Sequence, residues 1–123
     1  MKNILVVDDE PLVLMLLKRV LTEAGFNVLE ASSGEEAIEI SASFATRIHL
    51  LLTDLKMPGI CGQQLSATLL RQRPEMQVIY MSGYCDRAAA GLNSLDGSVG
   101  FLQKPFGRPN LRDRPDTFLY SMH

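Results

Sequence analysis

The chain alternates between short apolar runs and longer segments in which apolar residues recur every three or four positions. The short runs are typical of β-strands. The first and third are almost continuously apolar, as expected for central strands of a parallel sheet that is covered on both faces. The strands are predicted at residues 3–7, 27–31, 48–53, 77–81 and 99–102.

The first segment with helical periodicity begins at Pro11, a residue favoured at the first position of a helix, and is expected to stop at Gly25. Its apolar residues recur at helical spacing and are Val13, Leu16, Leu17, Val20, Leu21 and Ala24. This stripe predicts an amphipathic helix between the first two strands.

Three more helices are predicted further along the chain. The second begins at a capping box formed by Ser33 and Glu36. The third covers residues 62–71, and a short fourth covers residues 86–92. The apolar residues of the third helix that turn inward are Leu65, Leu69 and Leu70. Strands that alternate with helices predict right-handed crossovers and an α/β, doubly wound, five-stranded parallel sheet of order 2-1-3-4-5.

Composition narrows the class of protein. A chain of 123 residues with 46% hydrophobic and 21% charged residues is typical of one soluble globular domain. Its net charge of −2 does not favour nucleic-acid binding. Apolar runs fall well short of the roughly 20 residues that span a bilayer, and the N-terminus lacks a signal-peptide pattern. We therefore expect a cytoplasmic protein without nucleic-acid or membrane partners.

The cysteines and histidines do not indicate a zinc site or a nucleophilic cysteine. Cys61 and Cys85 are far apart and in no metal-ligand spacing, so we expect two reduced thiols. His49 lies in an apolar run and His123 ends the chain, and packing is the simpler role for both.

Charged and hydroxyl-bearing residues that could bind a ligand or take part in a reaction follow the predicted strands. The first strand is followed by Asp8 and Asp9, the third by Asp54, the fourth by Ser82 and the fifth by Lys104. The carboxyl ends of parallel strands share one rim, and ligands bind there at the switch point between strands 1 and 3. Each acid alone is most simply a turn or cap residue, but their joint position predicts a site.

The residue types at this rim favour phosphoryl chemistry. Adjacent carboxylates repel one another unless a cation lies between them, and oxygen ligands suit Mg²⁺. A carboxylate can also attack phosphorus and form an aspartyl phosphate. The cation and Lys104 would then neutralise the phosphoryl oxygens, and the hydroxyl of Ser82 would donate a hydrogen bond to them.

Four motifs in this order resemble the receiver domain of bacterial two-component response regulators. They are VVDDE at 6–10, LLTDLKMPGICG at 51–62, YMSGY at 80–84 and FLQKPF at 101–106. The amino-acid sequences of the last two motifs are most similar to those of receivers of hybrid sensor histidine kinases. The resemblance implies a flavodoxin-like fold and a cytoplasmic phosphoacceptor that takes its phosphoryl group from a histidine kinase or a histidine phosphotransfer protein. Its own catalysis would be limited to phosphorylating itself and slowly removing that group.

The resemblance implies roles for the acidic residues and the lysines. Asp54 resembles the phosphoacceptor of the family. Mg²⁺ would be bound by the side chains of Asp9 and Asp54, by Asp8 mainly through water, and by the backbone carbonyl of Lys56. Lys104 matches the family's lysine that contacts the phosphoryl group.

The resemblance also implies switch and structural roles. Ser82 and Phe101 occupy the positions of the hydroxyl and aromatic switch residues, although a phenylalanine in a strand is also ordinary core. Pro105 would follow a cis peptide bond, which X–Pro bonds tolerate. Pro58 and Gly62 match the loop that follows the phosphoacceptor.

Residues 107–123 depart from the family pattern. A receiver normally ends in a fifth amphipathic helix, but Pro115 would interrupt it, and the apolar residues form no continuous helical stripe. We therefore predict a receiver core at residues 1–106 and an atypical tail with the fifth helix short, irregular or displaced. Apolar area left uncovered on this C-terminal face would favour a partner or a homodimer.

Two other functions fit parts of the sequence. One is an interaction scaffold that binds partners regardless of phosphorylation, which the tail favours. The other is a Mg²⁺-dependent hydrolase of small phosphate esters. Such enzymes usually carry a second acid close after the nucleophile, where this chain has Leu55 and Lys56. The leading hypothesis is a switch driven by the added charge of about −1.5 to −2 on a phosphorylated side chain.

Overall fold

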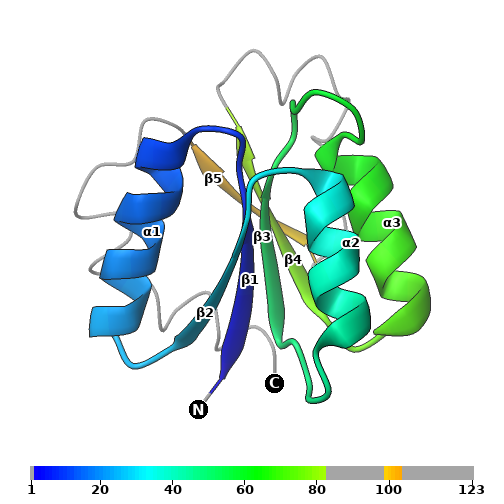
Figure 1. Cartoon of the computed structure of the whole chain (residues 1–123), viewed down its shortest axis with the longest axis horizontal. Coiled ribbons are helices and arrows are strands. Elements are labelled where there is room, and N and C mark those ends of the chain that lie inside the picture. Colours follow the sequence, from blue (N-terminus) through cyan, green and yellow to red (C-terminus); the bar gives the residue numbers. More distant parts are fainter. Residues whose placement is uncertain (1, 83–98, 104–123) are drawn as a thin grey trace.

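A computed structural model describes residues 2–82 and 99–103, with Ser82 and residues 99–103 described by their backbone alone. The strands form one parallel sheet in the order β2-β1-β3-β4-β5 (Figure 1). They are β1 (Asn3–Val7), β2 (Asn27–Ala31), β3 (Leu50–Asp54), β4 (Gln77–Ser82) and β5 (Val99–Gln103). The predicted fold class and strand order are confirmed.

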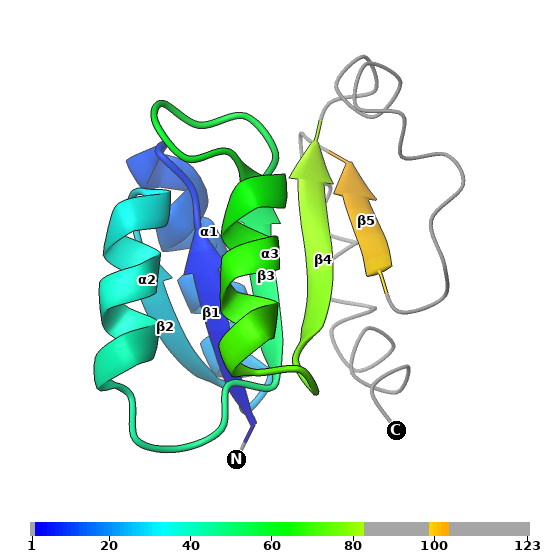
Figure 2. The same ribbon diagram turned by 90° about the vertical axis from the view of Figure 1, so that its right-hand side faces the viewer.

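Helices cover both faces of this sheet. Figure 1 shows α1 (Pro11–Glu23) on one face, and α2 (Gly34–Ser43) and α3 (Gly62–Gln72) on the other. Figure 2 shows α2 and α3 side by side in front of the strands. Among the described helices, none combines the length and the apolar character that crossing a membrane requires.

Strand β1 explains why a central strand is apolar at every position. Ile4 and Val6 pack into the cluster beneath α1, whereas Leu5 and Val7 pack into the cluster beneath α2 and α3. All four side chains are at most 1% exposed. Because successive residues of a strand point to opposite faces, a sheet with two covered faces needs an apolar residue at each step.

Two details of the sequence prediction were wrong at β3. The strand runs from Leu50 to Asp54 and not over residues 48–53. The Asn3 N–H donates to Nδ1 of the His49 side chain at 3.0 Å and not to a backbone carbonyl of the neighbouring strand. Regular pairing between β1 and β3 therefore starts one residue after Asn3 and His49, at Ile4 and Leu50. At the other end Asp54 is itself a strand residue, because it pairs with Met81 of β4.

The buried face of α1 also differs from the predicted stripe. Leu16 is 40% exposed, whereas Leu14, which the stripe omitted, is 8% exposed. Ala24 is exposed and lies beyond the helix as its C-cap. The helix carries more apolar residues than its sheet-facing side accommodates, so periodicity alone could not separate the two sides.

The capping box of α2 forms in a shifted version. Ser33 Oγ accepts the Glu36 N–H at 3.1 Å, as predicted. The Glu36 carboxylate accepts the N–H of Ser32 at 2.8 Å and not that of Ser33. Both bonds still satisfy donors at the start of the helix.

Several predictions lie outside the described residues. These are the short helix at 86–92, the tail at 107–123, and with the tail the homodimer through the C-terminal face. The boundary between a core at 1–106 and this tail therefore stays a prediction.

Candidate functional site

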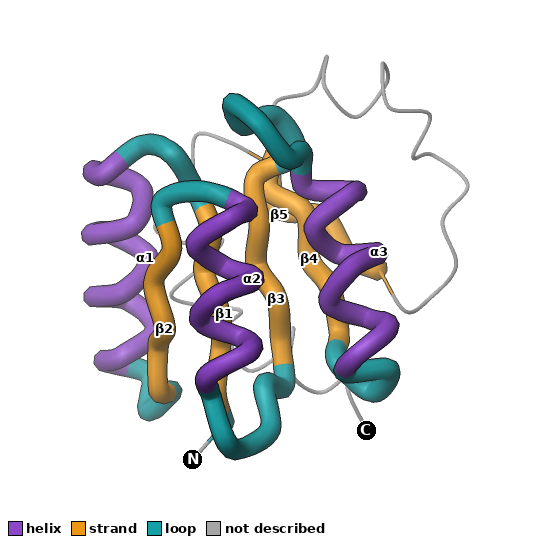
Figure 3. Tube along the Cα trace, turned by 45° about the vertical axis from the view of Figure 1, so that its right-hand side comes forward, coloured by secondary structure: helices purple, strands orange, loops and turns teal. Residues whose placement is uncertain are grey.

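The loops that follow β1 and β3 lie at the same end of the sheet (Figure 3). Val7 pairs with Thr53, so Asp8 and Asp54 occupy the next step along two neighbouring strands. Asp8 continues the pairing with β2, because its N–H donates to the carbonyl of Ala31 at 3.1 Å. Asp8 is 0% exposed and Asp54 is 6% exposed. Two buried carboxyl groups therefore stand at the switch point of the sheet.

Asp8, Asp9 and Glu10 form an acidic cluster at this rim. One carboxylate oxygen from each residue lies within 4.8 Å of the others. The turn is ordered by a hydrogen bond from the Glu10 N–H to Asp8 Oδ1 at 2.9 Å, after which Pro11 starts α1. Two unit charges at this separation repel by about 1 kcal/mol in water and about 3 kcal/mol at an effective dielectric constant of about 20. The cluster therefore favours a bound cation.

The chemistry of the donors in this cluster fits Mg²⁺. All three groups are carboxylates, and one of them, Asp8, is buried. Mg²⁺ prefers oxygen ligands and commonly takes one or two carboxylates while keeping several waters. The cluster includes Glu10, which the predicted ligand set omitted although it is the third acid of an unbroken run. The three consecutive acids at residues 8–10 were the sequence signal that could have identified Glu10 as a member of the cluster.

Asp54 ends β3 beside β4 and leads directly into a loop. The Leu55 N–H donates to the carbonyl of Met81 at 3.2 Å, which extends the strand pairing past Asp54. Asp54 Oδ1 accepts the N–H of Lys56 at 3.4 Å, at the long end of hydrogen-bond distances. Lys56 itself is exposed. The strand thus holds the backbone of Asp54, while its carboxylate faces the start of the loop.

The loop of residues 55–61 is packed closely against the end of β3. Leu55 and Met57 are buried, whereas Pro58 is exposed. At the far end the Gly62 N–H donates to the carbonyl of Leu55 at 3.0 Å. A Cβ atom at Gly62 would lie 2.2 Å from the carbonyl oxygen of Asp54, so this position requires glycine. Cys61 serves as the N-cap of α3 and is a free thiol.

The remaining predicted site residues are described in part or not at all. Ser82 is the last residue of β4 and pairs with Gln103 of β5, and Phe101 pairs with Tyr80. The side chains of Ser82 and Phe101, and all of Lys104 and Pro105, lie outside the described residues. Cys85 and His123 also lie outside them.

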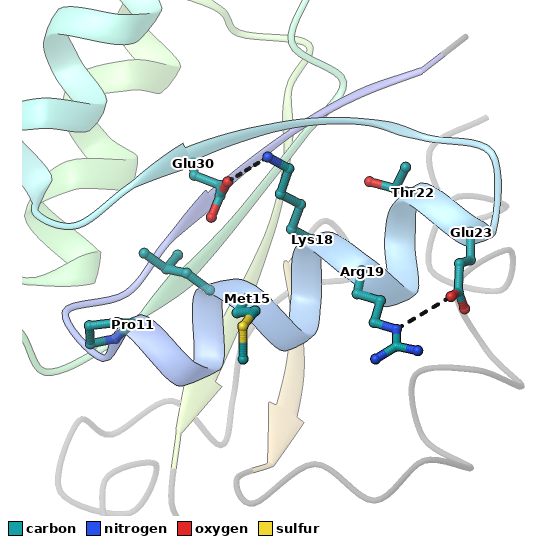
Figure 4. Close-up of a pocket in the computed structure, with 8 residues that line it drawn as sticks. Pro11, Met15, Lys18, Arg19, Thr22, Glu23 and Glu30 are labelled. Carbon is teal, nitrogen blue, oxygen red and sulfur yellow. Dashed lines mark ion pairs between the residues drawn. The ribbon is translucent and has the colours of Figure 1, made fainter.

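A groove lies along α1, and its lining includes Glu30 of β2. This groove has a volume of about 610 Å³ and is crossed by an ion pair between Lys18 and Glu30 at 3.2 Å (Figure 4). Arg19 and Glu23 form a second pair at 3.5 Å. Its described lining contains none of the predicted site residues. Exposed ion pairs of this kind contribute little to stability, and the groove offers no catalytic grouping.

Comparison with known proteins agrees with this geometry. The family model described as "Response regulator receiver domain" matches residues 4–115. The chain is 36% identical over 109 residues to the sensor kinase CckA of Brucella abortus (strain 2308), a match that covers 89% of this chain and 12% of that kinase. The chain therefore spans only a small part of this relative.

Solved structures share the fold over almost the whole chain. A response regulator receiver domain protein from Clostridium thermocellum has a TM-score of 0.83 and 31% identity, covering 98% of this chain and 95% of that one. The response regulator protein TrrA from Thermotoga maritima, in complex with Mg²⁺ and BeF, has a TM-score of 0.78 and 29% identity, covering 97% and 100%. With the acidic rim at the carboxyl ends of β1 and β3, these similarities show that the chain belongs to the response regulator receiver domain family.

Proposed function

We propose that Asp54 accepts a phosphoryl group from a histidine kinase or a histidine phosphotransfer protein in a Mg²⁺-dependent reaction. The observation that carries this proposal is the pairing of Val7 with Thr53, which sets the buried Asp54 one strand away from the acidic cluster. The family supports the same role, because its receivers are phosphoacceptors of two-component systems. The charge added at Asp54 then changes a binding surface of the domain.

In this reaction an oxygen of the Asp54 carboxylate attacks the phosphorus atom. A P–O bond forms, and the P–N bond to the histidine of the donor breaks. The side chains of Asp9 and Asp54, Asp8 through water and the Lys56 carbonyl would hold Mg²⁺, and Glu10 adds one more carboxylate to the cluster. Bound Mg²⁺ supplies neutralising charge to the phosphoryl oxygens.

The other proposed roles rest on the family resemblance. Lys104 pairs with the phosphoryl group, Ser82 donates a hydrogen bond to it, and Phe101 responds as the aromatic switch residue. Pro105 lies outside the described residues, so the cis peptide bond before it stays a prediction. In this proposal the domain is a signalling phosphoacceptor in the cytoplasm, and its own catalysis is limited to phosphorylating itself from the donor and slowly losing the phosphoryl group.

An exposed apolar surface on α1 supports docking of a protein donor. Leu12 is 73% exposed, Met15 is 62% exposed and Leu16 is 40% exposed. These positions are three and four residues apart and share one side of the helix. Because α1 starts directly after the acidic cluster, a donor seated on these side chains lies beside the rim that holds Asp54. Met15 also borders the groove in Figure 4.

The docking surface is tested by comparing two donors. Leu12→Gln combined with Met15→Gln removes the apolar side chains that the donor would contact. The double variant should therefore slow phosphorylation by a phosphotransfer protein by about tenfold, which corresponds to about 1.4 kcal/mol of lost contact energy. Phosphorylation by a small acyl phosphate should stay unchanged, since that donor needs no surface. Equal rates for the variant and the wild type with the protein donor would place docking elsewhere.

Phosphorylation at Asp54 is tested by intact-mass spectrometry after incubation with Mg²⁺ and a small acyl phosphate. The wild type should gain one phosphoryl group, and Asp54→Asn should gain none. Chelation of Mg²⁺ should prevent the gain. Glu39→Gln, which neutralises an exposed acid on α2, should behave as the wild type. A folded wild-type protein that binds Mg²⁺ and gains no phosphoryl group would refute the proposal.

A further inference from the structure

The loop after the phosphoacceptor is attached to the start of α2 by a carboxylate. Glu35 Oε1 accepts the N–H of Ile60 at 3.1 Å, although the two residues are 25 positions apart in sequence. The same carboxylate lies over Gly59, where an added Cβ atom would be 2.9 Å from Glu35 Oε1. Gly59 has φ of +80°, a conformation that favours glycine. The tip of the loop is therefore shaped to receive Glu35.

An apolar contact reinforces this attachment. A Cβ atom at Gly34 would lie 2.9 Å from Cβ of Ile60 and 3.2 Å from its Cγ2. Gly34 is the first residue of α2 and is buried, so its lack of a side chain lets Ile60 lie directly against the helix. Ile60 also packs against the core cluster beneath α2 and α3. The loop tip is thus held by a hydrogen bond and by packing.

The other anchor of the loop is the end of β3. Gly62 contacts the backbone of Asp54, and its N–H donates to Leu55 at 3.0 Å. Lys56, whose carbonyl is the proposed Mg²⁺ ligand, lies between this anchor and the tip. Its N–H already donates to Asp54 Oδ1 at 3.4 Å. A loop held at both ends presents the Lys56 carbonyl without having to be ordered when the cation binds.

We propose that Glu35 is a positioning residue for the phosphoacceptor site, because its carboxylate holds the loop that carries Lys56. The inference rests on the proposed function. Glu35 does not contact the cation or the phosphoryl group in this scheme. It acts through the backbone of Ile60, and so couples the start of α2 to the geometry around Asp54.

The experiment compares Glu35→Ala and Glu35→Gln with two matched controls in the full chain. Glu36→Ala weakens the cap of the same helix through Ser32 without a bond to the loop, and Glu39→Ala removes an exposed acid from the same helix. Titration of backbone amide resonances with MgCl₂ measures the Mg²⁺ affinity. Hydrogen exchange of the Ile60 amide reports the loop anchor, and urea denaturation shows that each variant folds.

Glu35→Ala should weaken Mg²⁺ binding by about three- to tenfold, less than the 10–100-fold typical of a group bonded directly to a metal ligand. Exchange at Ile60 should accelerate, and phosphorylation by a small acyl phosphate should slow to a similar degree. Glu35→Gln keeps an oxygen acceptor and should recover most of the Mg²⁺ affinity. Glu36→Ala should lower stability and leave the Mg²⁺ affinity unchanged.

Two results would overturn the inference while leaving the proposed function intact. One is a phosphorylated wild type together with a Glu35→Ala variant that has the same Mg²⁺ affinity and the same exchange at Ile60. The other is equal loss of affinity in Glu35→Ala and Glu36→Ala, which would assign the effect to the helix end. A wild type that binds no Mg²⁺ and takes no phosphoryl group would refute the proposed function and this inference together.

Discussion

Replacing Gly62 with alanine should disturb the proposed phosphoacceptor directly. Gly62 is the first residue of α3 and lies against the last residue of β3. The new Cβ atom would meet the carbonyl oxygen of Asp54 at 2.2 Å, and the Asp54 carbonyl carbon and Leu55 Cα at 3.1 Å. All three are backbone atoms. No side chain can rotate away, so the helix start or the strand end must move.

The size of the effect follows from these distances. Real Cβ atoms essentially never approach within 3.0 Å, so the shortest contact is 3.0 − 2.2 = 0.8 Å too close. Overpacking a rigid site typically costs about 1–3 kcal/mol and occasionally more. Alanine recovers at most about 1 kcal/mol of helix propensity. We expect a net loss of about 2 kcal/mol from a folding free energy of about 5–15 kcal/mol.

The same displacement should impair phosphorylation, because the group that moves is the backbone of Asp54. A misplacement of about 1 Å can cost about 100-fold in rate, so a loss of at least about tenfold is expected. Urea denaturation measures the stability, and intact-mass spectrometry over time measures phosphorylation by a small acyl phosphate. The control is Gln63→Ala, an exposed position one residue further along α3. A Gly62→Ala protein as stable and as quickly phosphorylated as the wild type would refute the reasoning.

Two further predictions concern the opposite end of the sheet. Arg73 donates to the hydroxyl and the carbonyl of Ser41 in the last turn of α2 and to the carbonyls of Phe44 and Thr46 just after it, each at 2.9 Å. Arg73→Ala should therefore lower the free energy of unfolding by about 2–3 kcal/mol in urea denaturation. The exposed Arg71→Ala should not, and phosphorylation should persist in both variants. The pKa of His49 is lowered from its ordinary value of 6.5, first by burial of the ring and then by the positive charges of Arg47 and Lys2. Because the unfolded chain then takes up the proton first, the stability is fully present above pH 6.5 and should fall as the pH drops from there toward the lowered pKa. His49→Gln should flatten this acid-side loss, and an unchanged pH profile would contradict the assignment.

Much of the fold and part of the site could be predicted from local patterns. A strand such as β1, apolar at every step, has to be covered on both faces, and alternating strands and helices then lead to a doubly wound parallel sheet. Asp8, Asp9 and Asp54 follow or end such strands, so topology alone brings them to one rim. These features depend on neighbours close in sequence and on the handedness of crossovers.

Other features depend on contacts between distant segments, which no local pattern encodes. The bond from Ile60 to Glu35 and the bonds from Arg73 to the end of α2 join residues 25 to 32 positions apart. In α1 the sequence offered apolar residues on several sides, and packing against the sheet buried Leu14 and left Leu16 exposed. The sequence by itself determined the order of the strands and the presence of acids at the ends of β1 and β3. Only the tertiary structure decided how the loop after Asp54 is held, because that depends on where α2 comes to lie against it.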